Sequence, residues 1–186
     1  MLVSLVVAAL TFVFALFFLT GSLGYATKFK DTNSINAENF VDASQNFVDT
    51  LVILSIVFIL LAAVLFVTSC NTRRNYYVTN YVAIGLFVAF ALFMTIFMIV
   101  NVSTTMNMFL NEINWDIVPD KIAALGGLYD MSKSDVYPFV IGYVVAAIVL
   151  VDAVFLVLST VWKVLLMKGE KKLLEGSANA HAEEVA

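Results

Sequence analysis

The fold is decided by one uncharged stretch, VTNYVAIGLFVAFALFMTIFMIV, which runs over 23 residues from Val78 to Val100. A helix needs about 20 consecutive apolar residues to cross the roughly 30 Å hydrocarbon core of a bilayer. Strands of a membrane barrel are about 10 residues long and alternate between apolar and polar positions. This run is longer than such a strand and does not alternate, so it predicts a transmembrane helix.

Three further stretches have the same character, at residues 2–25, 51–68 and 136–161. The whole chain of 186 residues is 62% apolar and only 13% charged, with a mean hydropathy of +0.96. A soluble globule of this size needs more polar surface than that. The sequence therefore predicts an all-α integral membrane protein, a bundle of four transmembrane helices within residues 1–172, with residues 2–25 kept as a permanent span.

Helical extensions are expected on the outer side of this bundle. Apolar residues continue at helical spacing before the second span, from Phe40 to Leu51, and after the third span, from Met106 to Ile113. Residues 118–125 predict one short interfacial helix, with Pro119 in its first turn. Beyond the fourth span, residues 173–186 are small and polar, which predicts a flexible cytoplasmic tail.

The basic residues predict the orientation of the chain. Lysine and arginine concentrate in the cytoplasmic connections of membrane proteins. Six of the ten basic residues lie densely in the second connection and after the fourth span: Arg73, Arg74, Lys163, Lys168, Lys171 and Lys172. We therefore expect a multi-pass protein of the cell membrane with both termini in the cytoplasm. These six residues are then cytoplasmic anchors that meet anionic lipid headgroups.

The chain offers few groups for catalysis or ligand binding. It has one cysteine, Cys70, and one histidine, His181, so no His/Cys cluster is available for a metal. Known catalytic and nucleotide-binding motifs are missing. The net charge of −4 argues against a nucleic-acid partner. We expect a protein that is no enzyme, has no catalytic residues, and binds no cofactor or metal.

Asp152 is the most informative side chain, because it lies about two thirds of the way through the fourth predicted span. A carboxylate costs roughly 2.5–3.5 kcal/mol at the centre of a membrane helix and avoids lipid. Ser159 lies on the same helical face. Three roles are open for Asp152: hydrogen bonding to a neighbouring helix, an ion pair with another subunit, or a proton or cation relay.

Small residues form a strip along the same span. Gly142, Ala146, Val149 and Ala153 share one helical face, along which a second helix can approach closely. That second helix can belong to the same chain or to another subunit.

Two functions follow from these observations. The first is a non-catalytic accessory subunit that packs, within the lipid bilayer, against the other subunits of a larger membrane transport or secretion complex. The alternative is a small homo-oligomeric channel or ion-coupled carrier in which Asp152 lines the path.

Overall fold

The structure, a computed structural model, describes residues 1–28, 37–70, 77–116 and 133–184, and no strand occurs among them. Four helices make up this part of the chain: α1 (Leu2–Lys28), α3 (Glu38–Cys70), α4 (Tyr77–Asn111) and α6 (Tyr137–Glu184). The all-helical prediction is confirmed. The interfacial helix predicted at 118–125 lies outside the described residues.

Three of the helices are long and apolar enough to cross a membrane, over Glu38–Cys70, Thr79–Asn111 and Tyr137–Gly169. They cover the second predicted span and all but the first residue of the third and fourth, and they indicate a membrane protein. In α1, the apolar helical stretch with described side chains is Leu2–Phe18.

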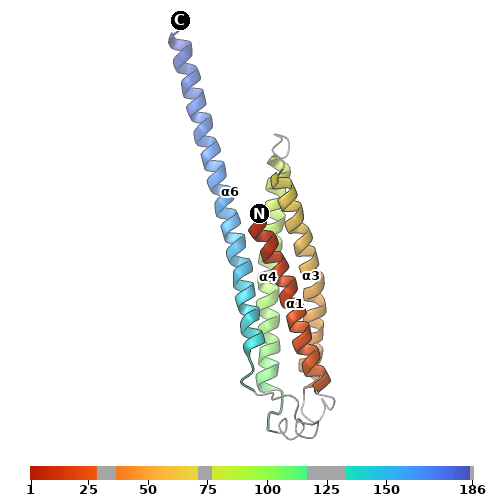
Figure 1. Ribbon diagram of the computed structural model, residues 1–186. Coiled ribbons are helices and arrows are strands. Elements are labelled where there is room, and N and C mark those ends of the chain that lie inside the picture. The colour runs from red at the N-terminus through yellow and green to blue at the C-terminus, as the bar shows by residue number, and fades with distance from the viewer. Residues whose placement is uncertain (29–36, 71–76, 117–132, 185–186) are drawn as a thin grey trace.

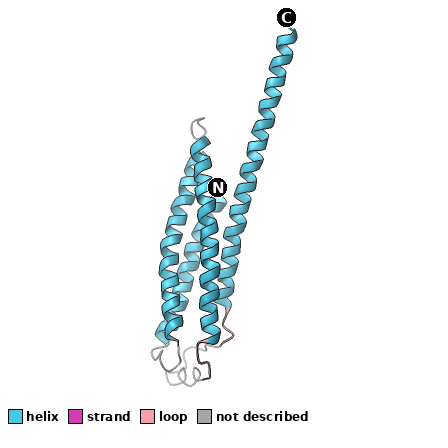
Figure 2. Cartoon of the chain, turned by 180° about the vertical axis from the view of Figure 1, so that it is seen from behind, coloured by secondary structure: helices cyan, strands magenta, loops and turns pink. Residues whose placement is uncertain are grey.

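The helices lie side by side and alternate in direction along the chain (Figure 1). α1 packs against α3 and α6, and α4 packs against the same two helices. α6 runs on alone beyond the other three helices, and the view from behind shows the same projection (Figure 2). The seams between neighbouring helices are therefore α1–α3, α3–α4, α4–α6 and α1–α6.

The helix ends follow from local sequence. α3 begins at Glu38, next to the start that the apolar spacing predicts, and α4 continues to Asn111 through the predicted extension. Pro138 lies in the first turn of α6, where its missing N–H removes no hydrogen bond. α6 continues to Glu184, through most of the segment expected to be a flexible tail. Alanine, glutamate and leucine are frequent there, and they are good helix formers.

The space between the helices is filled by side chains. Towards the start of α6, the core is rich in phenylalanine: Phe14, Phe18, Phe40, Phe47, Phe109 and Phe139. Towards the start of α1, smaller side chains surround Phe58 and Phe87, whose rings stack at 4.8 Å between centroids. Among the described residues, the interior therefore consists mainly of packed apolar side chains.

Candidate functional site

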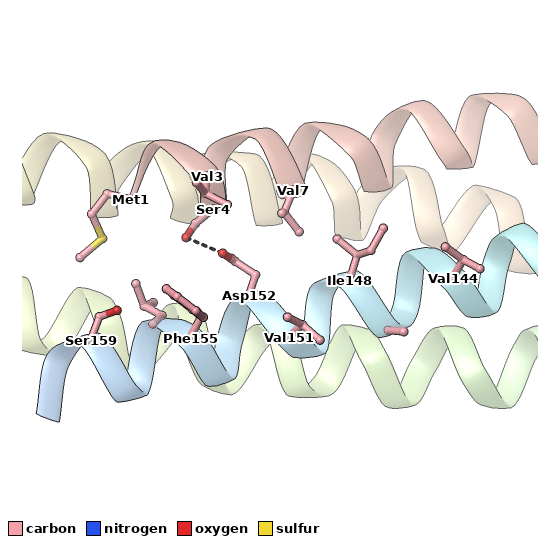
Figure 3. A pocket seen from close by; sticks show the side chains of 12 residues that line it. Met1, Val3, Ser4, Val7, Val144, Ile148, Val151, Asp152, Phe155 and Ser159 are labelled. Atoms are coloured by element: carbon pink, nitrogen blue, oxygen red, sulfur yellow. Dashed lines mark hydrogen bonds between the residues drawn. The ribbon is translucent and has the colours of Figure 1, made fainter. Parts of the chain in front are cut away.

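An apolar groove lies in the seam between α1 and α6 and has a volume of about 780 Å³. This α1–α6 groove is lined by side chains from the start of α1 and the middle of α6: Met1, Val3, Ser4, Val7, Val144, Ala147, Ile148, Val151, Asp152, Phe155, Leu156 and Ser159. Figure 3 shows the two walls facing each other. Most of the lining is apolar, so the few polar atoms in it stand out as candidates for recognition.

Helical spacing explains why α6 presents these residues together. Val144, Ile148, Asp152, Phe155 and Ser159 are separated by three or four positions, which places them along one face of a helix. α1 and α6 run in opposite directions, so the beginning of α1 meets the second half of the α6 span (Figure 1).

Asp152 and Ser4 form the polar centre of the groove. The Ser4 hydroxyl donates a hydrogen bond to Oδ1 of Asp152 at 3.2 Å (Figure 3). Both side chains are buried, and Asp152 is only 9% exposed. Three roles are open for Asp152. For one of them, hydrogen bonding to a neighbouring helix, the structure shows a partner, Ser4 on α1.

The second carboxylate oxygen of Asp152 has no such partner. Oδ2 is buried, and no described residue gives it a hydrogen bond. A buried polar atom without a partner costs about 1–3 kcal/mol, and more when the group is charged. Ser4 thus satisfies half of the carboxyl group, and the other half is enclosed without a hydrogen bond from a described residue.

Ser159 lines the same groove but lies apart from this pair. It is two helical turns beyond Asp152, about 10 Å along the axis at 1.5 Å per residue. In Figure 3 it lies beside Met1, at the end of the groove. The structure therefore brings Ser159 and Asp152 to one groove without joining them in one hydrogen-bonded group.

The strip of small residues faces the interior of the same chain. Gly142, Ala146, Val149 and Ala153 are all buried. At Gly142, an added Cβ would lie 2.9 Å from Cγ2 of Val102 on α4 and 3.1 Å from Cζ of Phe14 on α1. Real Cβ atoms essentially never come as close as 2.9 Å, and 3.1 Å is tighter than most contacts, so a side chain here would have to displace the ends of Val102 and Phe14. Glycine therefore allows α6 to approach both neighbours. The strip serves helix packing within the chain.

The basic residues lie away from the groove where they are described. Lys163 and Lys168 are exposed on α6 beyond Ser159. Lys171 and Lys172 follow on the same helix, while Arg73 and Arg74 lie outside the described residues. No three histidine, cysteine, aspartate or glutamate side chains gather in the described part of the chain as a metal site would require.

The sequence did not single out Ser4, the partner of Asp152. Two signals were available. Ser4 is a polar residue in an apolar run, and a carboxylate in a membrane span is costly, so it needs a polar partner. One sequence does not say which helices are neighbours, so it did not reveal which hydroxyl group reaches Asp152.

Comparisons with protein-family models, with curated proteins and with solved structures find no significant match to this chain.

Proposed function

We propose that this protein is a non-catalytic accessory subunit of a larger membrane complex, in transport or secretion, and that it binds its partner through the α1–α6 groove. The observation that carries the proposal is the half-satisfied Asp152. A carboxyl group with one hydrogen bond and one buried, unpartnered oxygen lies in the wall of an apolar groove.

A partner helix provides what lipid does not. Acyl chains have no hydrogen-bond donors, whereas hydroxyl, amide and basic side chains hydrogen-bond between transmembrane helices. Because Oδ2 is enclosed in the chain by itself, the Asp152 side chain would have to rotate for this oxygen to meet a partner. A donor from the partner would then remove the cost of leaving that oxygen unpaired.

The proposed subunit crosses the membrane four times, with α1 as the additional span, and has one short interfacial helix. Both termini lie in the cytoplasm of a cell-membrane protein, because the basic residues gather at that end. In this arrangement Asp152 lies near the middle of the bilayer. Trp162 is ten residues further along α6, about 15 Å away, at the depth where tryptophan concentrates.

The rival function is a homo-oligomeric channel or carrier with Asp152 in its path. Phenylalanine, methionine and alanine side chains pack the interior of the described bundle. A path past Asp152 would therefore run between copies of the chain, along the α1–α6 groove. The accessory-subunit function thus places a different protein next to Asp152, whereas the channel or carrier function places another copy of this chain there.

Complex formation and transport, measured side by side, separate these functions. The full-length protein is purified from its native membrane in mild detergent, as wild type, Asp152→Asn and Asp152→Leu, and the complexes are weighed by native mass spectrometry. We expect a complex with non-identical proteins, preserved in Asp152→Asn if the acid is neutral and weakened if it pairs with a basic group. Asp152→Leu removes both hydrogen-bonding atoms and should lower the yield of the complex. Complexes of this chain alone, with ion flux in liposomes that Asp152→Asn abolishes, would establish the rival function.

A further inference from the structure

The α1–α6 groove has a buried floor and an exposed rim. The floor consists of buried side chains from both helices: Ser4, Val7, Asp152 and Leu156. The rim consists of exposed side chains: Val3, Val144, Ala147, Ile148, Val151, Phe155 and Ser159. In a bilayer, a rim of this kind faces the acyl chains, so a molecule dissolved in the membrane can enter the groove from the side.

The size and lining of the groove suit a small molecule. Its volume of about 780 Å³ falls within the roughly 300–1,000 Å³ of pockets that hold drug-sized ligands. Such pockets are mostly apolar, with a few polar groups that orient the ligand. From Asp152 to Val144 the apolar wall of α6 is about 12 Å long, at 1.5 Å per residue. A ligand that matches the groove therefore has an apolar body and one polar group.

The polar group of this ligand has to donate hydrogen bonds. Asp152 is 9% exposed; Ser4 donates to its Oδ1, and no described residue donates to its Oδ2. An ionised carboxylate has about four lone-pair sites, and a hydroxyl oxygen that donates its proton can still accept a hydrogen bond. Asp152 and Ser4 together thus offer several acceptors, while the Ser4 proton is already used.

The charge of the ligand follows from the lack of a basic side chain near Asp152. No lysine, arginine or histidine stands in Leu2–Phe18, in α3 or α4, or in α6 before Lys163. Lys163 is eleven residues beyond Asp152, about 16 Å along the helix. Met1 also lines the groove and gives Oδ2 no hydrogen bond. A carboxylate within a membrane pairs with a cation, and the described residues do not supply one.

We propose that the α1–α6 groove binds a lipophilic amine, an apolar molecule whose amino group hydrogen-bonds to Asp152 and Ser4. An ammonium group has three N–H donors, as a lysine side chain does, and rotation of Asp152 brings the enclosed Oδ2 to it. The amine and the carboxyl group together have no net charge, whichever of them holds the proton. Lipid acyl chains fill the same space but leave the carboxyl group unpaired.

This ligand site goes beyond the proposed function, because it concerns a small molecule bound to the chain without its partner. A partner helix and the amine would compete for one groove. The site is therefore tested on the purified full-length chain alone, in nanodiscs, with empty nanodiscs of the same lipids as the background.

Three radiolabelled probes that share a decyl chain separate charge from hydrogen bonding. Decylamine has a positive charge and N–H donors, decyltrimethylammonium has the charge without a donor, and decanol has a donor without the charge. We expect the wild type to bind decylamine saturably and about tenfold more tightly than either other probe, because hydrogen bonds between charged groups are the stronger ones.

Two matched substitutions locate the site. Asp152→Asn keeps the size of the side chain and removes its charge, so it should weaken the binding of decylamine about tenfold. Asp42→Asn makes the same change at an exposed position of α3, outside the groove. It should leave the affinity for decylamine unchanged.

Each other outcome overturns the inference. Equal binding of the three probes would mean that the groove accepts any apolar chain. Unchanged binding of decylamine by Asp152→Asn would mean that the carboxyl group does not recognise it. No saturable binding by the wild type would mean that the groove holds lipid only. The comparison of probes needs no variant, so it decides even where Asp152→Asn fails to fold. A complex with non-identical proteins, weighed by native mass spectrometry, remains a separate test of the proposed function.

Discussion

The α3–α4 seam and the α1–α6 seam differ in how completely the chain closes them. In the first, Phe58 and Phe87 stack in the core, and Asn80 joins Thr68 and Ser69 at the end. In the second, an apolar groove remains open, and Asp152 has one of its two oxygens unpartnered. At these points the first seam is filled by side chains of the chain itself, although Ser44 Oγ on α3 is also buried without a described hydrogen-bond partner. The second has the features of a surface that another molecule completes.

The largest expected difference between the seams concerns phenylalanine. Phe58 is 0% exposed, and Phe155, in the groove, is 69% exposed. We expect Phe58→Ala to lower the free energy of unfolding by about 3–5 kcal/mol, as for other buried phenylalanines. Phe155→Ala should leave the stability of the isolated chain within about 0.5 kcal/mol but reduce the yield of the complex. Unfolding in detergent and co-purification measure the two effects. Similar losses of stability would show that the groove is closed in the folded chain.

Two glycine-to-alanine substitutions compare the packing strip with a position that has free space around it. Gly142→Ala forces Cβ against Val102 and Phe14, and such overpacking costs about 1–3 kcal/mol. Gly85→Ala meets no atom within 4 Å, and replacing a glycine inside a helix by alanine stabilises it by roughly 0.5–1 kcal/mol. The melting temperatures of the two variants should therefore move in opposite directions. A neutral Gly142→Ala would mean that α6 does not approach its neighbours this closely.

The smallest expected change concerns the hydrogen bond across the groove. Ser4→Ala removes the donor to Oδ1 of Asp152. Hydrogen bonds between transmembrane helices average about 0.6 kcal/mol, so the loss of stability should be near that value. In the Asp152→Leu background, the same substitution should change stability less, because the bond is already absent. Equal effects in both backgrounds would place Ser4 outside any interaction with Asp152.

Much of the fold follows from the sequence, because an apolar run of this length has few alternatives in a membrane. The spacing of Gly142, Ala146, Val149 and Ala153 also predicts that they share a face. It does not say which helix they meet, since that depends on the neighbours of α6. The partner of Asp152 was missed for the same reason. The end of α6 differs as well, because neither Gly169 nor Gly176 interrupts the helix.

The most direct test of the central claim compares two lipid-exposed positions with a photo-crosslinking amino acid. Val151 on α6 is 63% exposed beside the α1–α6 groove, and Ile96 on α4 is 65% exposed. Each position is substituted in the full-length protein and irradiated in native membranes, and the adducts are identified by mass spectrometry. We predict that Val151 gives a protein adduct with a non-identical membrane protein and that Ile96 gives lipid adducts only. Protein adducts from Ile96, with only lipid adducts from Val151, would contradict the account.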